Sequence, residues 1–138
     1  MHRCQIGVCL VFIIFLAAGM VSCAHSDPNL GRVLTTVTVT PETADGQSNP
    51  SGIVFTATGT FNLPPFSAPL TFAAPYSGQF ALDSPSGATI ANVISSGTGT
   101  VTVQCITGDA GTVFVTASAL ANNGTPTLVS GSGQLTCP

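Results

Sequence analysis

Apolar and polar residues alternate along most of the chain, with the period of two that predicts β-strands buried on one face. In residues 52–61, for example, Phe55, Ala57 and Phe61 share one parity, while threonines occupy most of the other. Glycine, proline, asparagine or aspartate separates one alternating segment from the next, as expected for turns. The pattern predicts strands at residues 32–40, 52–61, 78–83, 88–94, 100–105, 112–118 and 127–137. About seven short strands with turns between them predict an all-β sandwich.

Strand parity also indicates which residues face the core. In the shorter or less regular strands the inward residues are predicted to be Val33, Val37, Val39, Phe80, Leu82 and Ile90. Two stretches break the alternation. Residues 42–51 are rich in turn formers, and residues 62–77 contain four prolines, so neither stretch is predicted to contain a strand.

The first 22 residues have the three parts of a secretory signal peptide. A short basic start containing Arg3 precedes an apolar run over residues 6–20, and small residues such as Ala17 and Ala18 gather at its end. We therefore expect residues 1–22 to form a signal helix that is removed on export. An uncleaved anchor helix is the alternative, because the apolar run approaches the length of a membrane span.

The signal segment ends in Met20-Val21-Ser22-Cys23, which resembles the bacterial lipobox, with Met20 in place of the usual leucine. The resemblance implies that Cys23 becomes the first mature residue and carries a diacylglycerol thioether and an acylated amine, palmitate for example. Two or three fatty chains hold a protein firmly to a bilayer, and residues 23–31 would be the lipidated cysteine and a tether. Ala24 rather than aspartate after this cysteine indicates the outer membrane, by analogy with lipoprotein sorting. Ordinary cleavage after Ala24 would instead discard Cys23 and release a soluble, secreted domain.

The remaining cysteines indicate an exported domain with one disulfide. Cys4 and Cys9 lie in the signal segment, and the lipobox resemblance assigns Cys23 to lipid, which leaves Cys105 and Cys137. These two occupy the inward parity of their predicted strands, so a core disulfide between them is geometrically reasonable. Two thiols without a nearby histidine do not complete a metal site, and no metal is expected.

The charge balance excludes one class of partner. After the signal segment Arg32 is the only cation, against five Asp and Glu residues. Nucleic-acid binding requires several Lys or Arg side chains to neutralise phosphates, so no nucleic-acid partner is expected. Strongly anionic ligands are disfavoured for the same reason.

Catalytic residues are scarce in the predicted mature chain. Its one histidine, His25, falls in the tether, so a catalytic triad would depend on that residue. Asp45, Asp83 and Asp109 stand singly in turns, where aspartate is common for backbone reasons. A calcium site would need oxygens from several separate turns, so turn formation is the favoured role of these acids. We therefore expect no enzymatic activity and no cofactor.

Four parts of the predicted sandwich share a pattern with one known family. They are residues 37–41, residues 55–60, Ser84 with 88–90, and Gly108 with 111–117. In order and spacing they resemble the bacterial immunoglobulin-like domain of the second group, found in invasin- and intimin-type surface proteins. The resemblance implies an immunoglobulin-like sandwich over residues 32–138 and a role in presentation, but no particular ligand. The central aromatic is Phe80 where that family usually has tryptophan, and the chain holds one copy.

Residues 63–76 hold the candidate binding residues Phe66, Phe72 and Tyr76, placed between prolines. Aromatic side chains on a semi-rigid loop can bind a protein or glycan ligand at little entropic cost. Alternatively, they fold back and cover the end of the sandwich. Because chain direction reverses at each strand, this loop and the tether are predicted to lie at the same end.

The expected function is that of a lipid-anchored module of the bacterial cell envelope with a non-enzymatic binding or adhesion role. A purely structural or assembly subunit is the first alternative, and a soluble secreted domain follows if Cys23 is not lipidated. The membrane, reached through the anchor, is the partner that the sequence indicates most directly.

Overall fold

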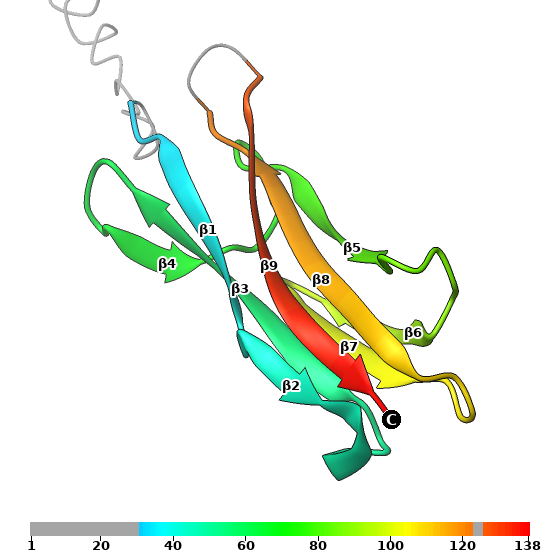
Figure 1. Cartoon of the computed structure of the whole chain (residues 1–138). Coiled ribbons are helices and arrows are strands. Elements are labelled where there is room, and N and C mark those ends of the chain that lie inside the picture. Colours follow the sequence, from blue (N-terminus) through cyan, green and yellow to red (C-terminus); the bar gives the residue numbers. More distant parts are fainter. Residues whose placement is uncertain (1–30, 123–125) are drawn as a thin grey trace, which may run out of the picture. The chain divides into compact units, whose positions relative to one another are not determined.

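The computed structural model describes residues 31–122 and 126–138, which form a sandwich of two β-sheets (Figure 1). Its nine strands are β1 (Leu34–Thr40), β2 (Thr43–Asp45), β3 (Ile53–Phe61), β4 (Ser67–Pro69), β5 (Gly78–Asp83), β6 (Ala91–Gly97), β7 (Thr100–Cys105), β8 (Gly111–Leu120) and β9 (Leu128–Cys137). A single 3-10 turn, η1 (Gly46–Ser48), follows β2, and the described residues include no α-helix. The all-β sandwich is thus confirmed. The predicted signal helix, Cys23 and all of the tether before Gly31 lie outside the described residues.

The first sheet has the order β1–β3–β7–β6, with the short β4 paired to one end of β3. The second sheet has the order β2–β9–β8–β5. Neighbouring strands run antiparallel except β2, which runs parallel to β9. The chain changes sheets at Pro41 and Glu42, between β1 and β2, so the N-terminal segment contributes to both layers.

Local alternation predicted most of these strands well. Strands β5 and β7 have the predicted bounds, β3 and β9 each begin one residue later than predicted, and β8 begins one residue earlier and ends two residues later. The inward faces are also confirmed: Phe55 and Ala57 are fully buried in β3, and Phe80 and Leu82 pack against the core from β5.

The prediction that residues 62–77 contain no strand is wrong. Ser67–Pro69 form β4, which pairs antiparallel with Thr58–Thr60 of β3. Pro69 is tolerated because it ends a strand at the edge of the sheet, where a missing N–H interrupts no ladder. The turn-rich stretch 42–51 likewise contains β2, whose parallel partner β9 lies far along the chain.

A β-bulge changes the predicted parity at the start of the first strand. The register of β1 on β3 shifts between Leu34 and Thr36. Leu34 is consequently buried, whereas Val33, predicted to face the core, is only half-buried. Val37 and Val39 follow the bulge and are buried as predicted.

The strand predicted at 88–94 begins and ends later than expected. Ile90 is buried as predicted but precedes β6, which spans Ala91–Gly97 and includes most of the predicted loop at 95–99. A register shift between Val93 and Ser95 then leaves Val93 and Ile94 exposed on the edge strand. A bulge of this kind cannot be inferred from residue types alone, because the pattern assumes an unbroken period of two.

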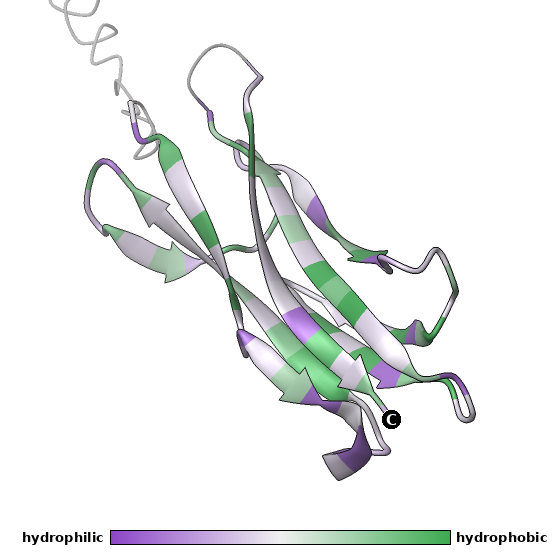
Figure 2. Cartoon of the chain, viewed as in Figure 1, coloured by the Kyte–Doolittle hydropathy of each residue, from purple (hydrophilic) through white to green (hydrophobic). Residues whose placement is uncertain are grey.

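The core lies between the facing surfaces of the two sheets. Apolar and polar bands alternate along β8 in Figure 2, and its buried residues all have the same parity. The largest fully buried side chains are Phe55, Leu34, Leu135, Val101, Val103, Val113 and Val115. The core is therefore built mainly from β-branched and small residues, with few large aromatic rings.

The sandwich has two distinct ends. At one, the entry end, Leu34 donates a backbone hydrogen bond to Ala121 O at 3.0 Å, and Leu120 donates one to Ser77 O at 3.0 Å. At the other, the disulfide end, Cys105 is bonded to Cys137 near the C-terminus. Gly31, the first described residue, lies at the entry end together with the β3–β4 turn. The predicted placement of the incoming chain beside residues 62–77 is confirmed from Gly31 onward.

Candidate functional site at the entry end

The aromatic residues predicted as binding candidates divide between the core and the surface. Tyr76 is 9% exposed, Phe72 is half-buried, and Phe66 is 60% exposed. Leu70, from the same stretch, is buried. The covering role therefore applies to Tyr76, Phe72 and Leu70, and only Phe66 is available to a partner.

Tyr76 joins the loop to the incoming chain. Its hydroxyl donates a hydrogen bond to the carbonyl of Arg32 at 2.9 Å. Its ring packs edge-on against Phe61, with the two ring centroids 5.0 Å apart and the planes at 62°. This arrangement satisfies the phenol while burying the ring, so Tyr76 has a structural role.

Phe72 covers the edge of the core beside β5. Its ring meets Phe80 edge-on, with centroids 5.2 Å apart and an interplanar angle of 89°. Phe72 has a φ of 56°, and a side chain at Gly78 would run into its ring. The half-buried Phe80 thus packs edge-on against Phe72.

The turn between β3 and β4 projects apolar residues into solvent. We call residues 63–66 (Leu63-Pro64-Pro65-Phe66) the β3–β4 tip. Leu63 is 44% exposed, Phe66 is 60% exposed, and both prolines are exposed. Leu128, which pairs with Leu120 at the start of β9, is a further exposed apolar residue at the entry end.

Arg32 holds the tip in place. Its Nη2 donates to Pro65 O at 2.6 Å, and its Nε donates to Leu63 O at 3.4 Å. The guanidinium carbon lies 3.5 Å from the centroid of the Phe61 ring. The planar guanidinium can donate two hydrogen bonds and stack at once, which an ammonium cannot do.

Asn62 adds two hydrogen bonds to the same junction. Its Oδ1 accepts from Val33 N at 2.6 Å, and its Nδ2 donates to Gly31 O at 3.2 Å. The first described residues are therefore held on both sides of Arg32 by Asn62, the residue that precedes the tip. Sequence patterns did not identify Asn62, because its partners are backbone groups with no signature of their own.

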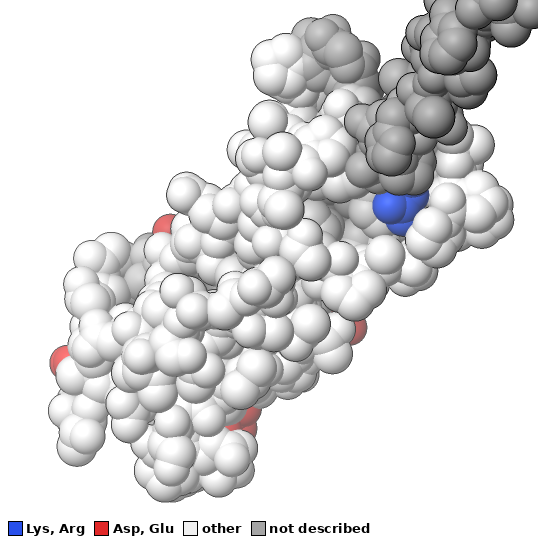
Figure 3. All heavy atoms as spheres, turned by 180° about the vertical axis from the view of Figure 1, so that it is seen from behind, with Lys and Arg blue, Asp and Glu red and all other residues white. Residues whose placement is uncertain are grey.

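Charge is distributed unevenly along the sandwich. The carboxylates of the described residues all belong to the half that carries the disulfide. Asp45 lies opposite Thr136 in the β2–β9 register, and Asp83 lies opposite Phe114 in the β5–β8 register. Glu42 adjoins β9, and Asp109 lies in the β7–β8 turn. Arg32, the one cation in this part of the chain, lies at the entry end (Figure 3). No carboxylate pairs with it among residues 31–122 and 126–138.

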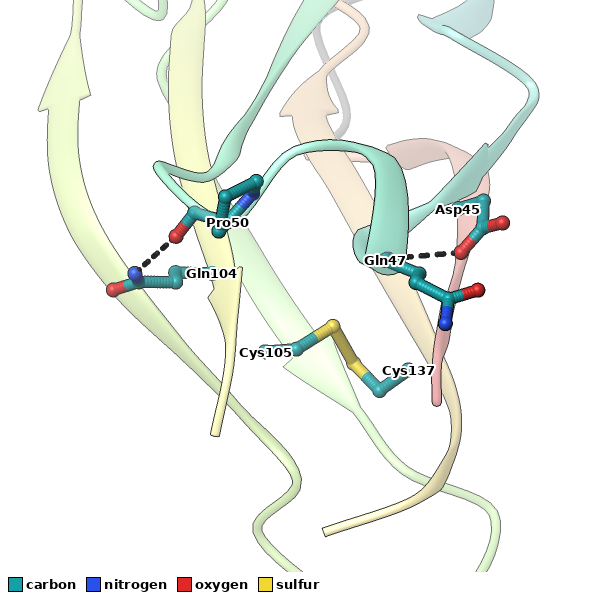
Figure 4. The surroundings of a disulfide bond; sticks show 6 residues. All are labelled: Asp45, Gln47, Pro50, Gln104, Cys105 and Cys137. Carbon is teal, nitrogen blue, oxygen red and sulfur yellow. Dashed lines mark hydrogen bonds between the residues drawn. A yellow bond between two sulfur atoms is a disulfide. The ribbon is translucent and has the colours of Figure 1, made fainter. Parts of the chain in front are cut away.

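The predicted disulfide between Cys105 and Cys137 is confirmed (Figure 4). It joins β7 of one sheet to β9 of the other, with 5.6 Å between the two Cα atoms. A disulfide indicates an extracytoplasmic location, since the cytosol keeps thiols reduced. Beside it, Gln104 Nε2 donates to Pro50 O at 2.5 Å, and both residues line a hollow of about 260 Å³.

The turn acids show no common site. Asp45 accepts a hydrogen bond from Gln47 N at 2.9 Å and caps η1, the backbone role expected of aspartate in a turn. Residues 31–122 and 126–138 contain no group of three or more His, Cys, Asp or Glu side chains placed to hold a metal ion. Within the same ranges, no helix is long and apolar enough to cross a bilayer. His25 and Cys23 lie outside them.

No protein-family model, no curated protein and no solved structure matches this chain. The candidate site is therefore identified by its geometry alone. It is an exposed apolar tip at the point where the chain enters the sandwich, and it is held by the one cation of the described domain.

Proposed function

We propose that the chain is a lipid-anchored module of the bacterial cell envelope, with an immunoglobulin-like sandwich and a non-enzymatic binding or adhesion role. The observation that carries the proposal is the position of the β3–β4 tip beside Gly31, eight residues after Cys23. An acyl anchor on Cys23 would bring the membrane to the end of the sandwich that presents exposed apolar residues.

Strand order supports the immunoglobulin-like part of the proposal. In that fold one sheet has the order A-B-E-D and the other contains C, F and G. Strands β1, β3, β7 and β6 fit the first order, and β5, β8 and β9 fit the second. The disulfide is a departure, because it connects the E and G positions and not the B and F positions used in antibody domains.

The disulfide supports export, which lipidation of Cys23 requires. Bonds of this kind persist in compartments that are oxidising, and the signal-like segment 1–22 precedes the sandwich. Export alone also fits the alternative of a soluble secreted domain. The state of Cys23 separates the two.

The decisive measurement is the intact mass of the protein recovered from a bacterial host. The proposal predicts a chain beginning at Cys23 that carries a diacylglyceryl group and an N-acyl group, with Cys105 and Cys137 oxidised. A Cys23→Ala variant should lose the lipid mass, whereas the matched control Cys9→Ala should retain it. An unmodified chain beginning after Ala24 would support the soluble alternative, and an uncleaved chain would support the anchor helix.

Binding is tested separately from anchoring. The yield of crosslinks that the protein forms with its neighbours in intact cells should decrease when Leu63 and Phe66 are both replaced by serine. The yield should be unchanged in Val93→Ser, which alters an exposed apolar residue elsewhere. If neither variant changes the yield, the purely structural alternative is favoured.

A further inference from the structure

The β3–β4 tip lies where the chain leaves the sandwich toward Cys23. Asn62 donates to Gly31 O at 3.2 Å, and a side chain at Gly31 would meet Leu63 Cδ1 at 4.0 Å. The eight residues from Ala24 to Gly31 span at most about 26–29 Å when fully extended. An acylated Cys23 would therefore keep the tip close to a bilayer surface.

We propose that the tip, together with Arg32, is a lipid-contacting surface whose partner is the headgroup and acyl boundary of the bilayer that holds the anchor. The inference rests on the proposed function, because without an acylated Cys23 no bilayer is held beside the tip. It narrows that function by assigning the exposed tip to lipid, and not to a protein or glycan.

The side chains of the tip suit this boundary. Phenylalanine and leucine are the residues that peripheral helices bury there, and here Phe66 and Leu63 project from one turn. The turn is already ordered by Arg32, so inserting it costs little conformational entropy.

The backbone of the tip exposes fewer unpaired polar groups than an ordinary turn of four residues, because two of its residues are prolines and three of its carbonyls have partners. A peptide group that enters the boundary without a hydrogen-bond partner is costly. Pro64 and Pro65 have no N–H to satisfy. The carbonyls of Leu63 and Pro65 accept from Arg32, and the carbonyl of Phe66 accepts from Phe61 N at 2.8 Å. Three of the six backbone N–H and C=O groups of the tip are therefore satisfied within the domain, all of them carbonyls.

Charge favours the same orientation. Membranes that contain anionic lipids attract arginine and repel carboxylates. Arg32 is beside the tip, and its Nη1 makes no hydrogen bond within the described residues, so it can donate to a lipid phosphate. The carboxylates of the described domain belong to the opposite half, away from the tip.

A second apolar patch does not share these features. Val54, Val93 and Ile94 are exposed on the first sheet, but they lie on β3 and β6 away from the tip. The structure does not indicate a partner for this patch. Val54 therefore provides the control position for an experiment.

The experiment uses the absence of tryptophan from the natural sequence. Phe66→Trp and, as the control, Val54→Trp each introduce a single indole at a position more than half exposed. The full acylated chain is placed in vesicles of phosphatidylglycerol and phosphatidylcholine, with part of the phosphatidylcholine brominated on its acyl chains. Intact mass verifies acylation first, and thermal unfolding verifies that both variants are as stable as the wild type.

We expect the emission of Phe66→Trp to shift to shorter wavelength and to be quenched by the brominated lipid, while Val54→Trp keeps the emission of an indole in water. Iodide, a quencher confined to water, provides the converse measurement. If iodide quenches both indoles equally, the indole at position 66 is in water, which would overturn the inference and favour a soluble partner for the tip. The indole of Phe66→Trp could instead become protected from iodide as more protein is added per vesicle, without being quenched by brominated lipid. That result would also overturn the inference, in favour of self-association. Failure of acylation would overturn the proposed function as well, whereas an acylated protein with an unquenched indole overturns the lipid contact alone.

Discussion

The guanidinium carbon of Arg32 lies 3.5 Å from the centroid of the Phe61 ring, at the point where the chain enters the sandwich. The same guanidinium donates to the carbonyls of Leu63 and Pro65. One side chain thus connects the entry segment, the aromatic residue at the end of β3 and the exposed tip. Its contribution depends on the planar shape of the group as well as on its charge.

Replacing Arg32 by lysine should therefore destabilise the domain. We expect Arg32→Lys to lower the free energy of unfolding by about 1–2 kcal/mol, because the ammonium cannot stack and reach both carbonyls together. Urea unfolding followed by circular dichroism measures the change. Thr38→Val, at an exposed position of β1, is the control and should remain near the wild-type value. An Arg32→Lys protein as stable as the wild type would show that charge alone explains the role of Arg32.

The residues of the 63–76 stretch should differ sharply in their effect on stability. Leu70→Ala should cost about 2–4 kcal/mol because it empties a buried site, and Tyr76→Phe about 1 kcal/mol because it removes the hydrogen bond to Arg32 O. Phe66→Ser should stay within about 0.5 kcal/mol of the wild type, since the ring is exposed. Melting temperatures test all three. A large loss in Phe66→Ser would mean that Phe66 also covers the core.

Sequence alone predicted the parts of the fold that depend on local pattern. The alternation in β3, β7 and β8 repeats every two residues, so strand bounds and inward faces follow directly from it. Strands β2 and β4 could not be predicted in this way. Each is three residues long and exists because of a partner elsewhere, β9 for the first and β3 for the second.

The candidate site was predicted only in part, for a related reason. Phe66, Phe72 and Tyr76 are equivalent in sequence, and only their contacts with Phe61 and Phe80 separate the covering residues from the exposed one. Arg32 was evident as a lone cation, but its partners are carbonyl oxygens, which every residue possesses. The lipid on Cys23 stays a prediction.

The close approach of β1 and β9 gives a third test. A Cβ added at Gly131 would collide with the carbonyl of Val37, so no side chain fits between the two strands without a shift of backbone. We expect Gly131→Ala to cost about 1–3 kcal/mol through overpacking. Ser132→Ala, on the adjacent exposed position of β9, is the matched control and should be nearly neutral. Equal stability of the two variants in urea would show that β1 moves away from β9 at little cost.

The disulfide should contribute a large part of the stability of this domain. Cys105 and Cys137 are 32 residues apart, and in the chain-entropy model closing a loop of that length stabilises by about 3–4 kcal/mol. We expect Cys105→Ala combined with Cys137→Ala to lose about that amount, and the reduced wild type to lose a similar amount. Urea unfolding of the oxidised protein, the reduced protein and the double variant measures the loss. Equal stability of the oxidised and reduced proteins would contradict the prediction.

Gly46 allows the packing of the disulfide to be tested apart from its effect on the unfolded chain. A Cβ at Gly46 would collide with Sγ of Cys105, so Gly46→Ala should destabilise the oxidised protein by about 1–3 kcal/mol. In the background of Cys105→Ala with Cys137→Ala the sulfur is absent, and the same substitution should cost much less. The four proteins form a double-mutant cycle whose coupling energy is read from their unfolding free energies. Additive losses would mean that η1 moves to admit the methyl group, and that its contact with the disulfide is not tight.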